Sequence, residues 1–99
     1  MPAYVIALVD VTDPEGYKEY VAGVPATLPA FGGRFIARAP GPEVLEGGPA
    51  PGRAVILEFP DVESARRWHA SEAYAPLVKM RQARSKGTLL LLPGYPPPA

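Results

Sequence analysis

Hydrophobic residues change their spacing along the chain, and each change predicts a new element. Residues 3–11, AYVIALVDV, are rich in β-branched and aromatic side chains and predict a strand. Both faces of this strand are mainly apolar, so we expect it to be covered on both sides. Residues 14–30 then carry apolar side chains at helical spacing, and Asp13 with Pro14 forms a typical helix start. The glycines at 32–33 end this predicted helix.

Two further strands are predicted in the middle of the chain, over residues 34–38 and 53–59. The segment between them, residues 39–52, is dominated by proline and glycine and reads APGPEVLEGGPAPG. Such a composition disfavours regular structure, so we expect this segment to leave the sheet as a long hairpin excursion.

The last third of the chain predicts a broken helix and a final strand. Asp61 starts one helical pattern, and Ser71 is positioned to cap a second one over about 72–85. Residues 87–93 predict the last strand, and residues 93–99 form a tail. The order is strand, helix, strand, strand, broken helix, strand, which is the pattern of a ferredoxin-like α+β sandwich with a four-stranded antiparallel sheet. We expect residues 1–99 to form a single domain of this kind.

The predicted fold has a consequence for assembly. Two helices cover one face of such a sheet, and the other face is bare in a monomer. Here that face carries apolar residues from the first and last strands, and a patch of that size is rarely left in water. We therefore expect a homodimer that packs its sheets face to face as a dimeric α/β barrel.

Composition and charge exclude several function classes. Ten basic and ten acidic residues give no net charge, which argues against a nucleic-acid partner. The absence of cysteine excludes disulfides, thiolate nucleophiles and cysteine zinc sites, and a single histidine does not make a metal site. The apolar runs are shorter than the roughly 20 residues of a membrane helix, and the N-terminus does not resemble a signal peptide. We expect a cytoplasmic protein with no membrane partner, metal or cofactor.

Several segments resemble one known family. They are TDPEGYKEYVAGVPATLPAFGGRFIAR, EVLEG and RAVILEFPDVESARRWHASEAYAPLVKMR, in unbroken order over about 90 residues. The most specific pieces are GGRF, LEG, EFPDVESARRW and SEAY followed by an arginine. Together they resemble the family called domain of unknown function 1330, of the dimeric α/β-barrel superfamily. The resemblance implies a ferredoxin-like fold and a homodimer, and it implies no established reaction.

The superfamily that this resemblance implies has diverse functions. Its members include antibiotic-biosynthesis monooxygenases, haem-degrading enzymes, muconolactone isomerase, chlorite dismutase and stress-response barrels, so the fold does not choose a function. The sequence departs from the family pattern at His69, where tyrosine is more usual, and at Glu72, where proline is frequent. His69 is therefore not inherited as a catalytic residue, and the last helix is expected to start as late as Ala75.

Arg34 and Glu58 are the first candidates for ligand binding. A hairpin centred near residue 46 places Arg34 opposite Glu58, Ile36 opposite Ile56, and Arg38 opposite Ala54. The first pair is either a charged anchor in a ligand pocket or an ion pair that fixes the strand register.

Other candidates lie on the last helix and around the excursion. Arg81 shares the inward side of its helix with Tyr74, and it needs an acidic or ligand partner there, Glu58 being one candidate. The alternative is an arginine whose stem packs while its head reaches water. The remaining candidates are Glu46 and Arg53 beside the excursion, which are otherwise loop or dimer contacts, and His69, which is otherwise a structural residue at a helix end.

Two function classes remain open at this stage. One is a cofactor-independent enzyme, monooxygenase- or isomerase-like, that acts on a small apolar or carboxylated metabolite. Its pocket would lie between sheet and helices, with Arg34, Glu58, Tyr74 and Arg81 as polar anchors. The other is a non-catalytic dimeric module that binds a ligand or has a structural role. An open pocket lined by these groups favours the first, and a solid interior with paired arginines favours the second.

Overall fold

The computed structural model of the protein describes residues 1–95, apart from the side chains of residues 39 and 40. The four strands form one antiparallel sheet in the order β2-β3-β1-β4, which confirms the ferredoxin-like α+β fold. The elements are β1 (Ala3–Val11), α1 (Pro14–Thr27), the short 3-10 helix η1 (Pro29–Phe31), β2 (Arg34–Pro40), β3 (Arg53–Phe59), α2 (Val62–His69), α3 (Ala75–Arg84) and β4 (Ser85–Pro93).

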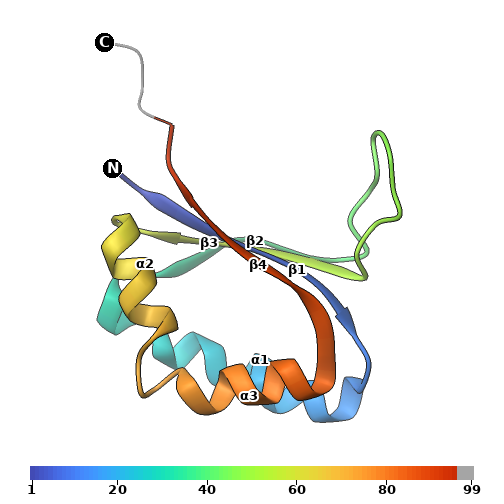
Figure 1. Cartoon of the computed structure of the whole chain (residues 1–99), viewed down its shortest axis with the longest axis horizontal. Helices are drawn as coiled ribbons and strands as arrows, with labels where there is room; N and C mark the ends of the chain where they lie inside the picture. The colour runs from blue at the N-terminus through green and yellow to red at the C-terminus, as the bar shows by residue number, and fades with distance from the viewer. Residues whose placement is uncertain (96–99) are drawn as a thin grey trace.

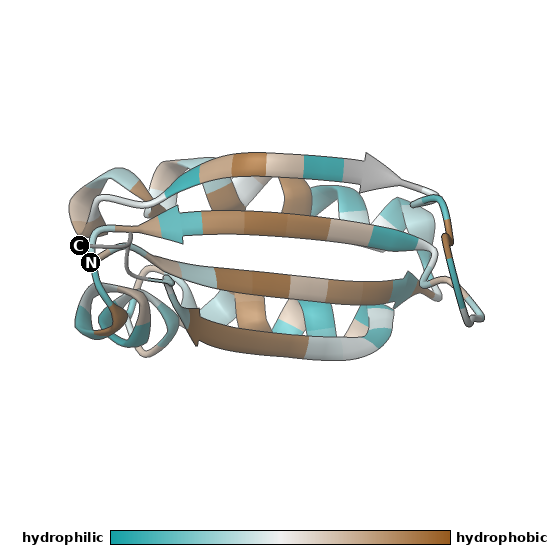
Figure 2. Cartoon of the chain, turned by 90° about the horizontal axis from the view of Figure 1, so that it is seen from above, coloured by the Kyte–Doolittle hydropathy of each residue, from teal (hydrophilic) through white to brown (hydrophobic). Residues whose placement is uncertain are grey.

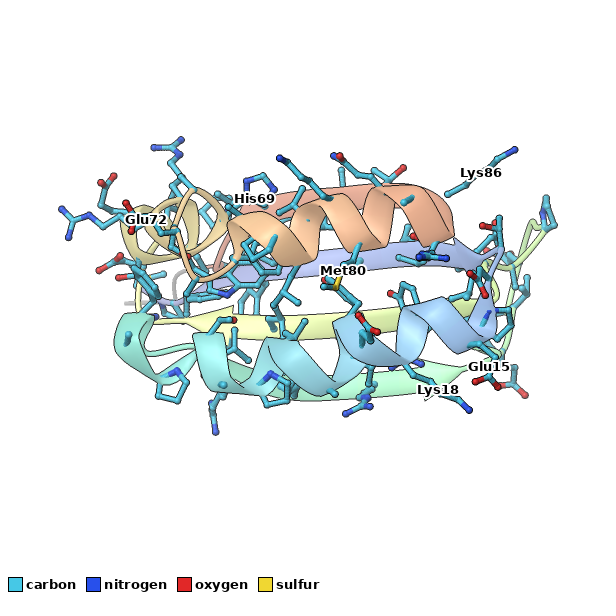
Figure 3. The ribbon with its side chains drawn as sticks, turned by 90° about the horizontal axis from the view of Figure 1, so that it is seen from below. Glu15, Lys18, His69, Glu72, Met80 and Lys86 are labelled. Carbon is cyan, nitrogen blue, oxygen red and sulfur yellow. The ribbon has the colours of Figure 1, made fainter. Side chains whose placement is uncertain are left out.

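All helices lie on one side of the sheet (Figure 1). Viewed from that side, α1 and α3 run side by side in front of the strands, with Met80 between them (Figure 3). The core therefore lies between this helix layer and the sheet. Its largest fully buried side chains are Trp68, Tyr74 and Phe59. The opposite face of the sheet carries no helix among residues 1–95.

The first helix begins where the sequence predicts. The Asp13 carboxylate accepts a hydrogen bond from the backbone N–H of Gly16 at 3.1 Å, and Pro14 occupies the first turn. That hydrogen bond, together with the ion pair to Arg84, lowers the pKa of the Asp13 carboxyl below its usual value. The helix continues through Pro25 to Thr27, and Gly32, at φ 71°, ends the 3-10 turn in the left-handed conformation that glycine adopts readily.

The predicted break in the second helix is present, and Ser71 forms it. Its hydroxyl donates to the backbone carbonyl of Trp68 at 2.7 Å and accepts from the backbone N–H of Tyr74 at 3.2 Å. These bonds give hydrogen-bond partners to a backbone carbonyl at the end of α2 and to the backbone N–H just before α3. Helix α3 starts at Ala75, as expected. The break turns both Trp68 and Tyr74 into the core.

The predicted register between β2 and β3 holds at one end only. Arg34 lies opposite Glu58 as expected, but a β-bulge between Phe35 and Ala37 shifts the rest of the ladder. Ala37 faces Ile56, and Arg38 faces Val55, so the predicted pairings of Ile36 with Ile56 and of Arg38 with Ala54 are wrong. An extra residue in one strand reverses the alternation beyond it, so Arg38 lies on the helix side of the sheet.

The excursion is slightly shorter than predicted, because β2 extends to Pro40 and leaves residues 41–52 outside the sheet. Figure 1 shows this segment rising from the sheet on the side opposite the helices. At its tip, Leu45 is 87% exposed. At the other end of the chain, the part of the predicted tail beyond residue 95 lies outside the described residues. No helix in the described part of the chain is long and apolar enough to cross a membrane.

Candidate functional site

A narrow pocket lies between the sheet and the helices, and we call it the helix–sheet pocket. Its volume is about 40 Å³, which is room for a few waters or a slim chain. Most of its surface is apolar. The apolar side chains around it include Val5, Ala7, Val24, Val55, Leu57 and Leu89.

Three arginines from different elements line this apolar pocket: Arg38 of β2, Arg53 of β3 and Arg81 of α3. The lining residues include no aspartate or glutamate. Among the described residues, the ion pairs of the molecule involve other cations, namely Lys18, Arg34, Arg67 and Arg84. The helix–sheet pocket is therefore cationic, with no protein carboxylate to neutralise it.

Arg81 is the most deeply placed of the three. It is only 9% exposed, and its Nε is a buried donor with no hydrogen-bond partner in the described part of the chain. Arg84, one turn later, pairs with Asp13 and does not join it. The prediction that Glu58 is the partner of Arg81 is wrong, because Glu58 lies on the other face of the sheet and pairs with Arg34. A buried guanidinium nitrogen without a hydrogen-bond partner lowers the stability of the folded protein, and a bound anion would remove that penalty.

Tyrosine hydroxyls lie next to these guanidinium groups. The hydroxyls of Tyr20 and Tyr74 are 2.6 Å apart, so one of them donates to the other. Burial raises the pKa of Tyr20 far above its usual value, and Tyr74 adds to the rise, while the charges of Arg81 and Arg53 oppose it. Burial likewise raises the pKa of Tyr17 and Tyr74. These hydroxyls therefore stay protonated near neutral pH and act as hydrogen-bond donors, not as bases.

Arg34 and Glu58 form the predicted cross-strand ion pair, with Nε and Nη2 of Arg34 at 2.9 and 2.7 Å from one carboxylate oxygen. They do not line the helix–sheet pocket, so the expectation that they share it with Tyr74 and Arg81 is wrong in this respect. By strand alternation they lie on the uncovered face, beside Tyr4 of β1. The Arg34 side chain is largely exposed, so the pair contributes at most about 1 kcal/mol and mainly fixes register.

His69 lies apart from the three arginines of the helix–sheet pocket. His69 is exposed at the end of α2, and Figure 3 shows it at the outer rim of the helix layer. It borders a separate surface groove with Arg66 and Leu90, and its ring centroid is 5.9 Å from that of Tyr74. Trp68, in contrast, is buried, and its Nε1–H donates to the Thr27 hydroxyl at 2.9 Å.

The predicted ligand-binding residues thus lie in separate parts of the molecule. Arg53 and Arg81 line the helix–sheet pocket, and Tyr74 contacts it through Tyr20, while Glu46 lies exposed on the excursion. Sequence reasoning missed Arg38, because no local signal marks the bulge that turns it inward. Tyr17 and Tyr20 also line the pocket, because their helical spacing places them on the inner face of α1.

The chemistry available in this pocket is binding and polarisation. Guanidinium groups and tyrosine hydroxyls donate hydrogen bonds to carboxylates or to a developing enolate. The lining residues include no Asp, Glu or His, so no side chain there is suited to accept a proton near neutral pH. Among residues 1–95, no three His, Cys, Asp or Glu side chains gather as a metal site.

Comparison with known proteins gives a family and a fold. The family described as Domain of unknown function (DUF1330) matches residues 2–95. The RPA0582 protein of unknown function from Rhodopseudomonas palustris has a TM-score of 0.80 at 21% identity, covering 97% of this chain and 84% of that one. A dimeric ferredoxin-like protein of unknown function from Jannaschia sp. CCS1 has a TM-score of 0.77 at 11% identity, covering 93% and 98%.

A third similar structure is that of an enzyme. SnoaB, a cofactor-independent oxygenase from Streptomyces nogalater, has a TM-score of 0.67 at 16% identity, covering 97% of this chain and 95% of that one. At these identities the structural likenesses show the fold alone. No curated protein matches the sequence.

Proposed function

We propose a function from the geometry of the pocket. This chain belongs to the DUF1330 family, and the description of that family assigns no reaction. We propose that the protein is a homodimer that binds a small apolar molecule carrying a negative charge, a carboxylate being the simplest case, in the helix–sheet pocket. One observation carries the proposal: the buried Nε of Arg81 has no hydrogen-bond partner among the described residues, and it belongs to an apolar pocket whose lining residues include no Asp or Glu.

Binding is favoured over a purely structural role by the distribution of charge. A buried arginine is normally paired with an acid or a carbonyl. Here the more exposed Arg34 and Arg84 are paired, with Glu58 and Asp13, whereas Arg81 forms no ion pair among the described residues. Arg38 and Arg53 also lack ion pairs among the described residues, and their guanidinium carbons lie 5.4 and 5.9 Å from the ring centroids of Phe35 and Tyr17. Aromatic faces hold such cations in place and leave their N–H edges free for an anion.

A second function, cofactor-independent oxygenation or isomerisation of the bound molecule, is supported by the same donors. Arg81 and a hydroxyl of the Tyr20–Tyr74 pair can stabilise an anion that develops on a substrate. The pocket lacks a base, so the substrate would have to be acidic already or to enter as an anion. This is why binding is the first proposal and catalysis the second.

The test of this proposal compares hexanoate with hexan-1-ol, which differ in charge and match in length. The acid should bind at least about tenfold more tightly in titration calorimetry, because charge-assisted hydrogen bonds form only with the carboxylate. Equal affinity, or no binding of either, would contradict the proposal. Ligand recovered unchanged after incubation in air supports binding alone, and conversion supports the enzyme.

The homodimer is proposed to form through the uncovered face of the sheet. Figure 2, seen from the uncovered side, shows apolar residues next to one another on neighbouring strands of the sheet. Leu90 and Leu92 of β4 are 43% and 45% exposed there, and Ile36 of β2 is 44% exposed. A neighbouring structure of the same fold is described as dimeric. The excursion rises on this side of the sheet, so its exposed Leu45 is available to a second copy.

A charge on this apolar face should break the dimer. We expect Leu90→Glu to halve the mass measured by light scattering, from twice the 10.5 kDa chain mass to the chain mass itself, because a buried unpaired carboxylate is costly in an apolar interface. Ala83→Glu, on the exposed surface of α3, is the matched control and should remain dimeric. A wild-type protein that is monomeric at micromolar concentration would refute the proposal, as would a dimeric Leu90→Glu variant with unchanged affinity.

A further inference from the structure

The helix–sheet pocket is continued by surface hollows at two of its sides, and each of these junctions carries one of the arginines. On one side, Arg81 also borders a hollow of about 290 Å³ between α3 and β4. On the other side, Arg53 and Tyr17 border a hollow of about 410 Å³ beside α1. Both of these cations also line the narrow apolar section of about 40 Å³.

The two arginines line the same pocket as Tyr17 and Tyr20. The positive charges of Arg53 and Arg81 both oppose the rise that burial causes in the pKa of Tyr17 and of Tyr20. Both guanidinium groups are therefore within electrostatic reach of the pocket's hydroxyls. A single carboxylate at Arg81 would leave the charge of Arg53 without a partner at the other opening.

Arg53 is better placed than the third arginine to receive a second anion. Its guanidinium lies over the ring of Tyr17, which lines both the narrow section and the hollow. Arg38 lies over Phe35 and borders neither hollow. Lys18, the other cation of the hollow beside α1, already pairs with Glu15 at 3.1 Å.

We propose that the pocket selects a slim molecule with two negatively charged ends, such as an aliphatic dicarboxylate. One carboxylate is held by Arg81, the other by Arg53, and the methylene chain passes through the apolar section between them. The inference rests on the proposed function, and it adds the class of ligand. Three features support it together: a cation at each of the two junctions with a surface hollow, an apolar section lined by both cations, and no Asp or Glu among the lining residues.

The experiment uses unbranched diacids of four to eight carbons, each compared by calorimetry with the monoacid of equal length. At one chain length we expect the diacid to bind at least about tenfold more tightly, because the second carboxylate gains its own charge-assisted contact. In Arg53→Met this preference should disappear, because the second carboxylate then loses its guanidinium partner. Arg53→Gln provides a second variant if the first does not fold, and Lys18→Met is the control that should keep the preference.

The outcomes separate this inference from the function on which it rests. Diacids that bind no better than monoacids at every length would overturn the inference and leave carboxylate binding intact. A preference that is lost in Arg38→Met and kept in Arg53→Met would overturn the assignment to Arg53. No binding of any acid would overturn both the inference and the proposed function.

Discussion

Replacing Arg81 with methionine is expected to abolish carboxylate binding and to make the ligand-free protein more stable. The two effects have one cause. In the folded protein the Arg81 residue is nine-tenths buried and its Nε has no hydrogen-bond partner among the described residues, whereas in the unfolded chain water solvates the whole guanidinium. Methionine fills the space of the stem and needs no hydrogen-bond partner.

The size of both effects follows from the cost of burying a donor without a partner. Removing that cost should raise the free energy of unfolding by about 1 kcal/mol or more, which is roughly 4–8 °C in melting temperature for a chain of this size. Affinity for hexanoate should fall by about 100-fold, since the anchoring charge is lost. Thermal melts at one fixed protein concentration and calorimetry measure the two effects, because the stability of a dimer depends on concentration.

Arg84→Met is the matched control, since it makes the same chemical change one turn further along α3. Arg84 pairs with Asp13 outside the pocket, so its loss should lower stability slightly and leave binding unchanged. Arg81→Lys should bind acids weakly, because an ammonium group lacks the planar fork of guanidinium. Retained hexanoate binding in Arg81→Met would contradict the assignment of the anchor, and lower stability would show that the buried charge is satisfied.

Replacing Trp68 with alanine is expected to cause the largest loss of stability in the chain, about 3–5 kcal/mol. Trp68 is 1% exposed and packs on Tyr74 at a ring-centroid distance of 4.1 Å and on Phe59 at 5.3 Å. It also donates to the Thr27 hydroxyl, which connects α2 to the end of α1. Urea denaturation measures the loss.

Trp68→Phe keeps the prediction testable if the alanine variant does not fold. It retains an aromatic ring and loses the indole N–H, so a smaller loss, about 1–2 kcal/mol, is expected. Arg67→Ala is the control, because Arg67 is exposed on the adjacent position and only pairs with Glu63 across one turn, so the change should stay within about 0.5 kcal/mol. Equal losses in Trp68→Phe and Arg67→Ala would contradict the structural role assigned to the indole.

Much of this fold could be predicted because its signals are local. The cap at Asp13, the break at Ser71 and the start of the last helix at Ala75 each depend on a few neighbouring residues. The inward side of Arg81 followed from helical spacing alone. The ion pair of Arg34 with Glu58 followed from counting along a hairpin, because it lies before the bulge and is not affected by it.

The site itself was only partly predictable, because its composition depends on which face each strand residue takes. One extra residue between Phe35 and Ala37 reverses the alternation, and Arg38 moves to the helix side while Arg34 remains on the other. The sequence by itself determined the order of elements, the start of the first helix and the apolar uncovered face, since these follow from short-range pattern. Only the tertiary structure decided which charges line the pocket, because Arg38, Arg53 and Arg81 come from elements far apart in the chain.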